Sequence, residues 1–132
     1  MAKITGIGGV FFKTQNPKEL AEWYKTNLGL DLEAWGGSII KWPNDQASDK
    51  GLTVWSVAPS DTKWFEPSTS SFMINYRVDN MAEMLVQLKV GNVEVVKGPE
   101  YHENGVFAWI MDPAGNKLEL WEPMAWDDKN KK

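Results

Sequence analysis

The side chain best suited to do chemistry in this sequence is the carboxylate of Glu119, which lies between two leucines in the segment LELWEP. Such a carboxylate can hold a metal ion, act as a general base, or accept hydrogen bonds from polar neighbours. If it is partly buried without a metal, it needs hydrogen-bond partners. The candidate partners on predicted strands are Asn75, Tyr76, Arg77 and Lys117. Because alternate strand residues share a face, Glu119 shares one with Lys117 and Trp121.

Tryptophan is the second chemical feature, with eight copies among 132 residues. Tryptophan fills protein cores, and it also lines apolar ligand pockets. Trp109 and Trp121 fall inside two predicted strands close to Glu119. An acidic, tryptophan-lined cavity would suit an aromatic or cationic small molecule through stacking and cation–π contacts. The alternative is that the tryptophans fill the core.

The single histidine, His102, lies in a predicted loop. Two positions are open to it: the protein surface, or the mouth of a cavity where it could act as a base. No residue pattern around a serine or threonine indicates a nucleophile with a base.

Composition excludes several classes of protein. The formal charge of −4 and the pI near 5.0 argue against nucleic-acid binding, which needs a basic surface. The chain has no cysteine, so disulfides and thiolate metal sites are excluded. No apolar run approaches membrane-spanning length, and no signal peptide is evident, so we expect a cytoplasmic protein without membrane contact.

The elements that must position these residues are read from turn and cap signals. Residues 106–123 predict a β-hairpin around DPAGN, with Gly115 at positive φ. Helices are predicted to begin after Asn16 and Asn80 and to end at Gly29 and Gly91. Strands are predicted at residues 4–13, 30–35, 38–42, 52–58, 72–78 and 93–96.

The two halves of the chain repeat this order of elements. VFFKTQN at residues 10–16 matches INYRVDN at residues 74–80 with an offset of 64, and Gly51 matches Gly115 with the same offset. Two copies of β-α-β-β-β explain this pattern. We therefore expect one domain over residues 1–132, with modules at about 4–58 and 72–123, a linker at 59–71 and a polar tail.

Three segments carry a family resemblance: GIGGVFFKTQNPKELAEWYKTNLGL, NYRVDN and DPAGNKLELWEP. They resemble the glyoxalase/bleomycin-resistance/dioxygenase superfamily, whose members are also called vicinal-oxygen-chelate proteins. The resemblance implies an α+β fold, in which two βαβββ modules form a curled mixed sheet around a cavity. It also implies a homodimer.

The resemblance further implies four positions that hold a divalent metal in catalytic members. Carried over by motif, these positions are Gly9, Trp55, Met73 and Glu119. A divalent ion of the kind used in this family prefers oxygen or imidazole ligands, which three of the four positions do not offer. We therefore expect no cofactor, with Glu119 as a metal ligand if a divalent ion does bind.

Two hypotheses of function follow. The first is a metal-independent protein that binds a small aromatic or amphipathic molecule, as the antibiotic-binding members of the superfamily do. The second is an enzyme related to glyoxalase, a lyase, isomerase or ring-cleaving dioxygenase with Glu119 as catalytic base or metal ligand. An interaction module without a cavity is a third alternative. Besides Glu119, the predicted ligand contacts are Phe11, Trp55, Met73, Asn75, Arg77, Trp109 and Trp121.

Overall fold

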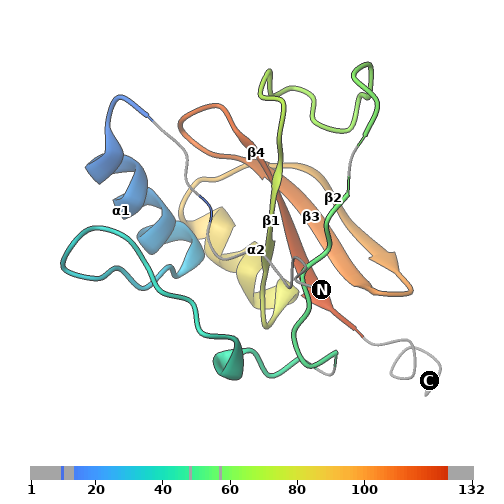
Figure 1. Ribbon diagram of the computed structural model, residues 1–132, viewed down its shortest axis with the longest axis horizontal. Coiled ribbons are helices and arrows are strands. Elements are labelled where there is room, and N and C mark those ends of the chain that lie inside the picture. The colour runs from blue at the N-terminus through green and yellow to red at the C-terminus, as the bar shows by residue number, and fades with distance from the viewer. Residues whose placement is uncertain (1–9, 11–13, 48, 57, 125–132) are drawn as a thin grey trace, which may run out of the picture.

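The computed structural model describes residues 10, 14–47, 49–56 and 58–124 (Figure 1). Its elements in chain order are α1 (Pro17–Leu28), the 3-10 turn η1 (Trp42–Asn44), β1 (Ile74–Arg77), α2 (Met81–Val90), β2 (Val95–His102), β3 (Gly105–Met111) and β4 (Lys117–Pro123). The predicted strand at residues 4–13 lies outside the described residues except for Val10.

The strands of the described residues form one mixed sheet with the order β1-β4-β3-β2. β4 pairs in parallel with β1 on one side and antiparallel with β3 on the other. β2 pairs antiparallel with β3. The order β1-α2-β2-β3-β4 is one βαβββ-like module, so the fold is α+β as predicted.

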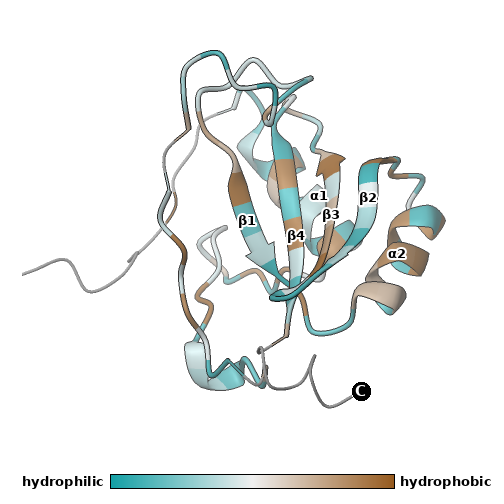
Figure 2. Ribbon diagram, turned by 90° about the vertical axis from the view of Figure 1, so that its right-hand side faces the viewer, coloured by the Kyte–Doolittle hydropathy of each residue, from teal (hydrophilic) through white to brown (hydrophobic). Residues whose placement is uncertain are grey.

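One face of this sheet is covered by both helices. Hydrophobic and hydrophilic residues alternate along β4 (Figure 2). Leu118 and Leu120 therefore point to the same face, which is the helix side. They pack with Tyr24 of α1 and Leu88 of α2 in the buried core. We call the opposite side of the sheet the open face; it carries Asn75, Arg77, Lys117, Glu119, Trp121, Phe107 and Trp109.

The helix ends follow the predicted signals in most respects. Asn80 caps α2, since its side chain accepts a hydrogen bond from the Glu83 N–H at 3.0 Å. Gly29 closes α1 in the left-handed conformation. The prediction that Asn16 caps α1 is wrong, because its side chain makes no cap hydrogen bond. Neither helix in the described part of the chain is long and apolar enough to cross a membrane.

The prediction of two modules in a curled sheet is wrong for the described residues. The described residues within 30–35, 38–42 and 52–58 form no strand. Val57 is not among the described residues. Apolar residues stand next to each other there, as in Ile39-Ile40 and Val54-Trp55, instead of alternating. Adjacent residues of a strand face opposite sides, so such a strand needs cover on both faces. These side chains are instead exposed.

The closing hairpin has the predicted form, and Gly115 has a φ of +85°. Asp112 is buried at its start. Its Oδ1 accepts hydrogen bonds from the Ala114 and Asn116 N–H groups, both at 2.9 Å. Its Oδ2 accepts from the Tyr24 hydroxyl at 2.8 Å and from the Asn116 amide at 3.1 Å. The aspartate of the DPAGN motif therefore joins the turn to α1.

We expect Asp112→Ala to lower the free energy of unfolding by about 3 kcal/mol, because it leaves a buried hydroxyl and turn N–H groups without their acceptor. Urea denaturation measures this loss, with the exposed Asp61→Ala as the matched control. Equal stability of the two variants would contradict the role assigned to Asp112.

Candidate functional site

Two rows of side chains cross the open face from strand to strand. The sheet register places Lys97, Trp109, Glu119 and Asn75 opposite one another in the first row. It places Glu100, Phe107, Trp121 and Arg77 opposite one another in the second row. Each row therefore draws one side chain from each strand of the sheet.

An irregularity in β2 brings Lys97 and Glu100 to the same face. Residues three apart in a regular strand point to opposite faces. Register shifts on both sides of Lys97 remove that alternation. Gly98 lies between the two residues with a φ of +93°, and an added Cβ would lie 2.9 Å from the Phe107 carbonyl oxygen. A side chain at position 98 would therefore push β2 away from β3.

Glu119 is the centre of the first row and is 8% exposed. Its Oε1 accepts a hydrogen bond from Asn75 Nδ2 at 2.7 Å, and its Oε2 accepts one from Trp109 Nε1 at 3.0 Å. The prediction that Asn75 is a hydrogen-bond partner of Glu119 is thus confirmed. Arg77 instead binds Asp45 and is not a hydrogen-bond partner of Glu119. The indole of Trp109 is a partner that strand alternation did not predict.

Two lysines lie against the ring of Trp109. The ammonium of Lys97 lies 5.0 Å from the ring centroid and that of Lys117 lies 6.0 Å from it. Lys117 also donates a hydrogen bond to the Trp64 carbonyl oxygen at 2.6 Å. Burial lowers the pKa of Lys117, and the nearby Lys97 ammonium lowers it further.

Aromatic rings connect the two rows. Phe107 stacks on Trp109 with a centroid distance of 6.2 Å and an interplanar angle of 18°. It also stacks on its cross-strand neighbour Trp121, at 5.8 Å and 6°. Trp121 Nε1 donates to the Asn104 carbonyl oxygen at 2.8 Å, which fixes that ring. The open face therefore holds a series of nearly parallel rings.

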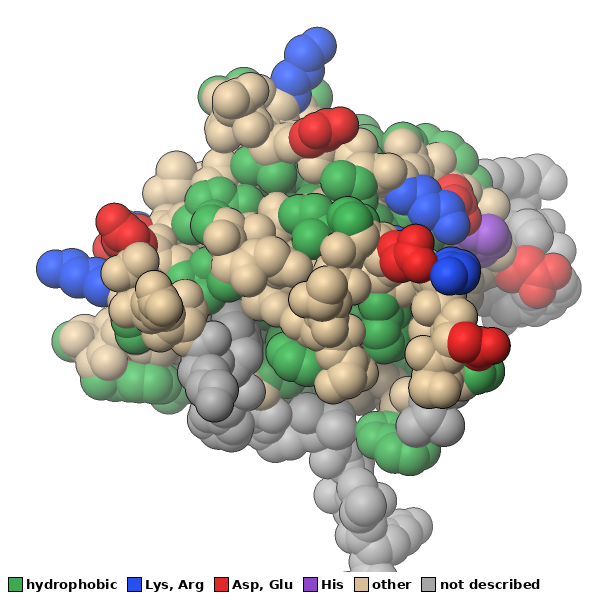
Figure 3. Space-filling model, turned by 90° about the horizontal axis from the view of Figure 1, so that it is seen from above, with side chains coloured by type: hydrophobic (Ala, Val, Ile, Leu, Met, Phe, Trp, Pro, Cys, Tyr) green, Lys and Arg blue, Asp and Glu red, His purple; other side chains and the backbone are tan. Residues whose placement is uncertain are grey.

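An open groove of about 740 Å³ lies along this series of rings. Its lining consists of Trp64, Lys97, Glu100, His102, Glu103, Asn104, Phe107, Trp109 and Glu119. The volume is within the usual range for sites that bind small molecules. In a view from above, blue and red charged side chains lie next to the purple histidine near one edge of the molecule (Figure 3).

The prediction that His102 lies in a loop is wrong, because it is the last residue of β2; its side chain is exposed and also belongs to the groove lining. Its Nε2 lies 3.0 Å from Glu100 Oε1, and its ring contacts the Phe107 ring edge-on at 5.6 Å. The His102 ring and the Lys97 ammonium lower the pKa of the Glu100 carboxyl. A role for His102 as a base stays a prediction.

Most of the other predicted ligand contacts do not belong to the groove lining. Phe11 lies outside the described residues. Trp55 is 75% exposed and Met73 precedes β1, and neither belongs to the groove lining. Trp121 is buried beside the groove. Of the predicted ligand contacts, Trp109 and Glu119 line the groove itself.

Sequence reasoning missed Phe107 and Trp64. Phe107 precedes Trp109 by two residues, so strand alternation could have placed it on the same face. Trp64 lies in a series of turns within residues 59–71, where no periodic pattern indicates a face. Its place at the groove depends on the Lys117 hydrogen bond to its carbonyl.

The side chains at the four metal positions that the resemblance implies do not fit a divalent ion. The indole of Trp55 and the thioether of Met73 are not ligands for such an ion, so of these positions only Glu119 offers a suitable side chain. Gly9 lies outside the described residues and has no side-chain ligand. Among the described residues, no three histidine, aspartate or glutamate side chains are grouped so that they could hold a metal.

Comparison with known proteins gives a structural match only. No protein-family model matches this sequence, and no curated protein matches it. TnmS3, an antibiotic-binding protein from Streptomyces sp. CB03234, matches with a TM-score of 0.50 and 25% identity, over 83% of this chain and 88% of TnmS3. The chain shares its fold with an antibiotic-binding protein.

Two further solved structures match more weakly. A protein from Agrobacterium tumefaciens has a TM-score of 0.46 and 18% identity, over 83% of this chain and 90% of its own. A protein from the mobile metagenome of V. Pseudocholerae has a TM-score of 0.48 and 13% identity, over 91% and 95%.

We expect Glu119→Gln to lower the free energy of unfolding by about 2 kcal/mol, because the amide of glutamine would face one of the two N–H donors. Thermal and urea unfolding measure the loss, with Glu22→Gln on the exposed side of α1 as control. A Glu119→Gln variant as stable as the control would show that the two hydrogen bonds do not hold the row together.

Proposed function

We propose that this protein binds a small aromatic or amphipathic molecule in the groove, without the divalent metal that the family resemblance implies. The observation that carries the proposal is the nearly parallel pair Phe107 and Trp109 in the lining of a groove of about 740 Å³. Aromatic rings bind flat apolar ligands by burying area and by stacking or edge contacts. The fold shared with the antibiotic-binding protein TnmS3 supports a small molecule as the ligand.

The groove also offers contacts that would orient a ligand. Trp64 supplies an aromatic side chain from outside the sheet. Glu100, Glu103 and Glu119 bring carboxylates to the lining, where Lys97 supplies an ammonium. This excess of carboxylates favours a ligand with a protonated amine. Lys97 is half exposed and lies 3.6 Å from Glu100, so a ligand could displace it from the Trp109 ring at small cost.

The second candidate is a lyase, isomerase or dioxygenase with Glu119 as general base. The observation that favours it is that the carboxylate lines the groove while Asn75 and Trp109 hold both of its oxygens in place. A fixed carboxylate beside a bound ligand is the geometry that proton abstraction needs. The version of this hypothesis with a metal has no support from the side chains at the implied metal positions.

We expect Trp109→Leu to weaken binding of 1-naphthylmethylamine about tenfold, since the variant loses an aromatic ring of the groove lining and the hydrogen bond that holds Glu119. Isothermal titration or ligand-observed NMR measures the dissociation constant. Trp35→Leu is the control, because Trp35 is exposed and is not part of the groove lining. Equal affinities for the wild type and Trp109→Leu would refute the proposed site, and chemical conversion of the probe would favour the enzyme.

We also propose that the protein forms a homodimer. The side chains that support this are the exposed apolar residues Ile39, Ile40, Val54 and Trp55. They lie in segments that belong to no strand of the described chain. A second copy of the chain would cover apolar area that is otherwise in contact with water.

Sedimentation equilibrium tests the dimer. We expect the wild type to have the mass of two chains and the double variant Ile40→Lys/Val54→Lys to have the mass of one, because buried lysines oppose association. Val90→Lys on the exposed side of α2 should behave as the wild type. A wild type with the mass of a single chain at all concentrations would contradict the proposal.

A further inference from the structure

The ammonium of Lys97 lies between an aromatic ring and a carboxylate of the groove. Its nitrogen is 5.0 Å from the ring centroid of Trp109 and 3.6 Å from Glu100 Oε2. An indole face attracts a cation through its quadrupole, and a carboxylate attracts it through its charge. All three side chains line the groove. The groove therefore contains a position that suits an ammonium group, and a side chain of the protein occupies it.

The irregular form of β2 creates this position. Lys97 pairs across the sheet with Trp109, and Glu100 pairs with Phe107. In a regular strand, residues 97 and 100 would point to opposite faces. The register shift between them brings the carboxylate of the second row and the ring of the first row to the same ammonium.

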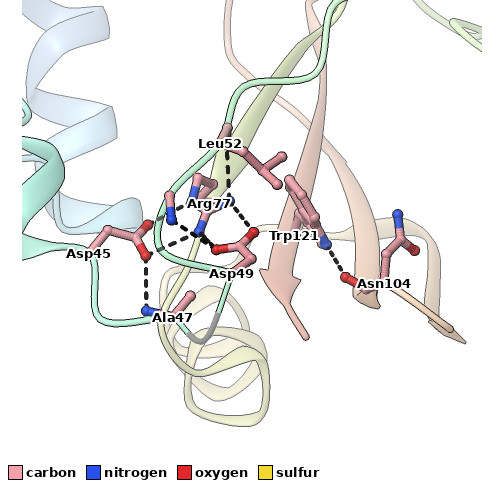
Figure 4. Close-up of polar contacts among 8 residues, drawn as sticks. Asp45, Ala47, Asp49, Leu52, Arg77, Asn104 and Trp121 are labelled. Atoms are coloured by element: carbon pink, nitrogen blue, oxygen red, sulfur yellow. Dashed lines mark hydrogen bonds and ion pairs between the residues drawn. The ribbon is translucent and has the colours of Figure 1, made fainter. Parts of the chain in front are cut away.

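Lys97 is held less firmly than two other cations of the open face. Arg77 donates to both oxygens of Asp45 and to both oxygens of Asp49, at 2.6 to 3.1 Å (Figure 4). Lys117 is buried, donates to a backbone carbonyl oxygen at 2.6 Å and does not belong to the groove lining. The side chain of Lys97 is 55% exposed, and its ion pair in the groove has an N–O distance of 3.6 Å. Because exposed ion pairs of this kind contribute little to stability, Lys97 can leave its position at small cost.

Glu100 is the carboxylate that a ligand can reach at this position. Its side chain is 34% exposed, and it also contacts the ring of His102, which is itself exposed. The His102 ring lowers the pKa of the Glu100 carboxyl, so the carboxylate is charged at neutral pH. Glu119, by contrast, is buried, and both of its oxygens accept hydrogen bonds from side chains of the sheet.

We infer that the position of the Lys97 ammonium, between Trp109 and Glu100, is the subsite for the ammonium group of the ligand, which displaces Lys97 when it binds. The inference rests on the proposed function of the groove. It narrows the ligand class to aromatic molecules that carry an amine close to the ring system, because Phe107 both stacks on Trp109 and pairs with Glu100 across the sheet. Lys97 then competes with the ligand, so its removal strengthens the binding of an amine.

The test compares two probes with the same ring system, 1-naphthylmethylamine and the uncharged 1-naphthylmethanol. Lys97→Met removes the competing ammonium and keeps an unbranched side chain. Glu100→Gln removes the charge that attracts the ligand. Lys89→Met and Glu94→Gln make the same charge changes at exposed positions outside the groove lining and serve as matched controls. Isothermal titration at neutral pH and about 0.15 M salt, where distant charges are screened, measures the dissociation constants.

We expect Lys97→Met to bind the amine about fivefold more tightly than the wild type, because the ligand no longer has to displace an ammonium. We expect Glu100→Gln to bind the amine about tenfold more weakly, because it loses a charge-assisted contact. Both variants should bind the alcohol within about a factor of two of the wild type. Both controls should bind the two probes as the wild type does.

A Lys97→Met variant that binds the amine no more tightly than the wild type would overturn the inference, and so would a Glu100→Gln variant with unchanged affinity for it. Equal changes for the amine and the alcohol would also overturn it, because they would reflect the shape of the groove and not the charge. Failure of the proposed function gives a different result, since the alcohol would then bind the wild type and Trp109→Leu with equal affinity.

Discussion

The central strand β4 is buried on both faces, and this constraint determines how the rest of the structure is arranged. On the helix side, the leucines of β4 are buried in the hydrophobic core. On the open face the same strand carries Lys117 and Glu119, both nearly inaccessible to water. Buried charges need partners. Glu119 finds them in Asn75 and Trp109, and Lys117 finds one in the Trp64 carbonyl.

These partners connect the sheet to segments that do not belong to it. Lys117 holds the turn segment around Trp64 against one side of the open face. Arg77 holds the segment that contains Asp45 and Asp49 against the other side. The groove lies along Phe107 and Trp109. Its position therefore follows from where the polar residues of β1 and β4 find their hydrogen bonds.

Local signals in the sequence predicted most of the second half of the chain, although β2 runs to His102, beyond the strand predicted at residues 93–96. The DPAGN turn, the Asn80 cap and the strand pattern around Glu119 each depend on residues close in sequence. The hydrogen bond between Asn75 and Glu119 was predictable because both residues fall on polar positions of predicted strands. The aspartate of the turn motif also has a structural role that the motif alone did not indicate, since it bonds to Tyr24, which is far away in sequence.

The rest of the site could not be predicted, for two physical reasons. A bulge changes which residues share a face, so alternation could not place Lys97 and Glu100 together in the groove. The repeat predicted strands in the first half, but their adjacent apolar residues need cover that the described chain does not provide. The same error made Trp55 a predicted ligand contact, although its side chain is exposed. Trp64 was missed because no periodic pattern of residues surrounds it.

The most direct test of the account is an NMR spectrum of the tryptophan indole N–H groups, recorded while 1-naphthylmethylamine is added. Single tryptophan variants assign the signals. We expect the signals of Trp109 and Trp64 to shift with a common dissociation constant, while those of Trp35 and Trp55 stay in place. A shift of Trp55 with an unchanged Trp109 would contradict the proposed site and favour the position that the family resemblance implied.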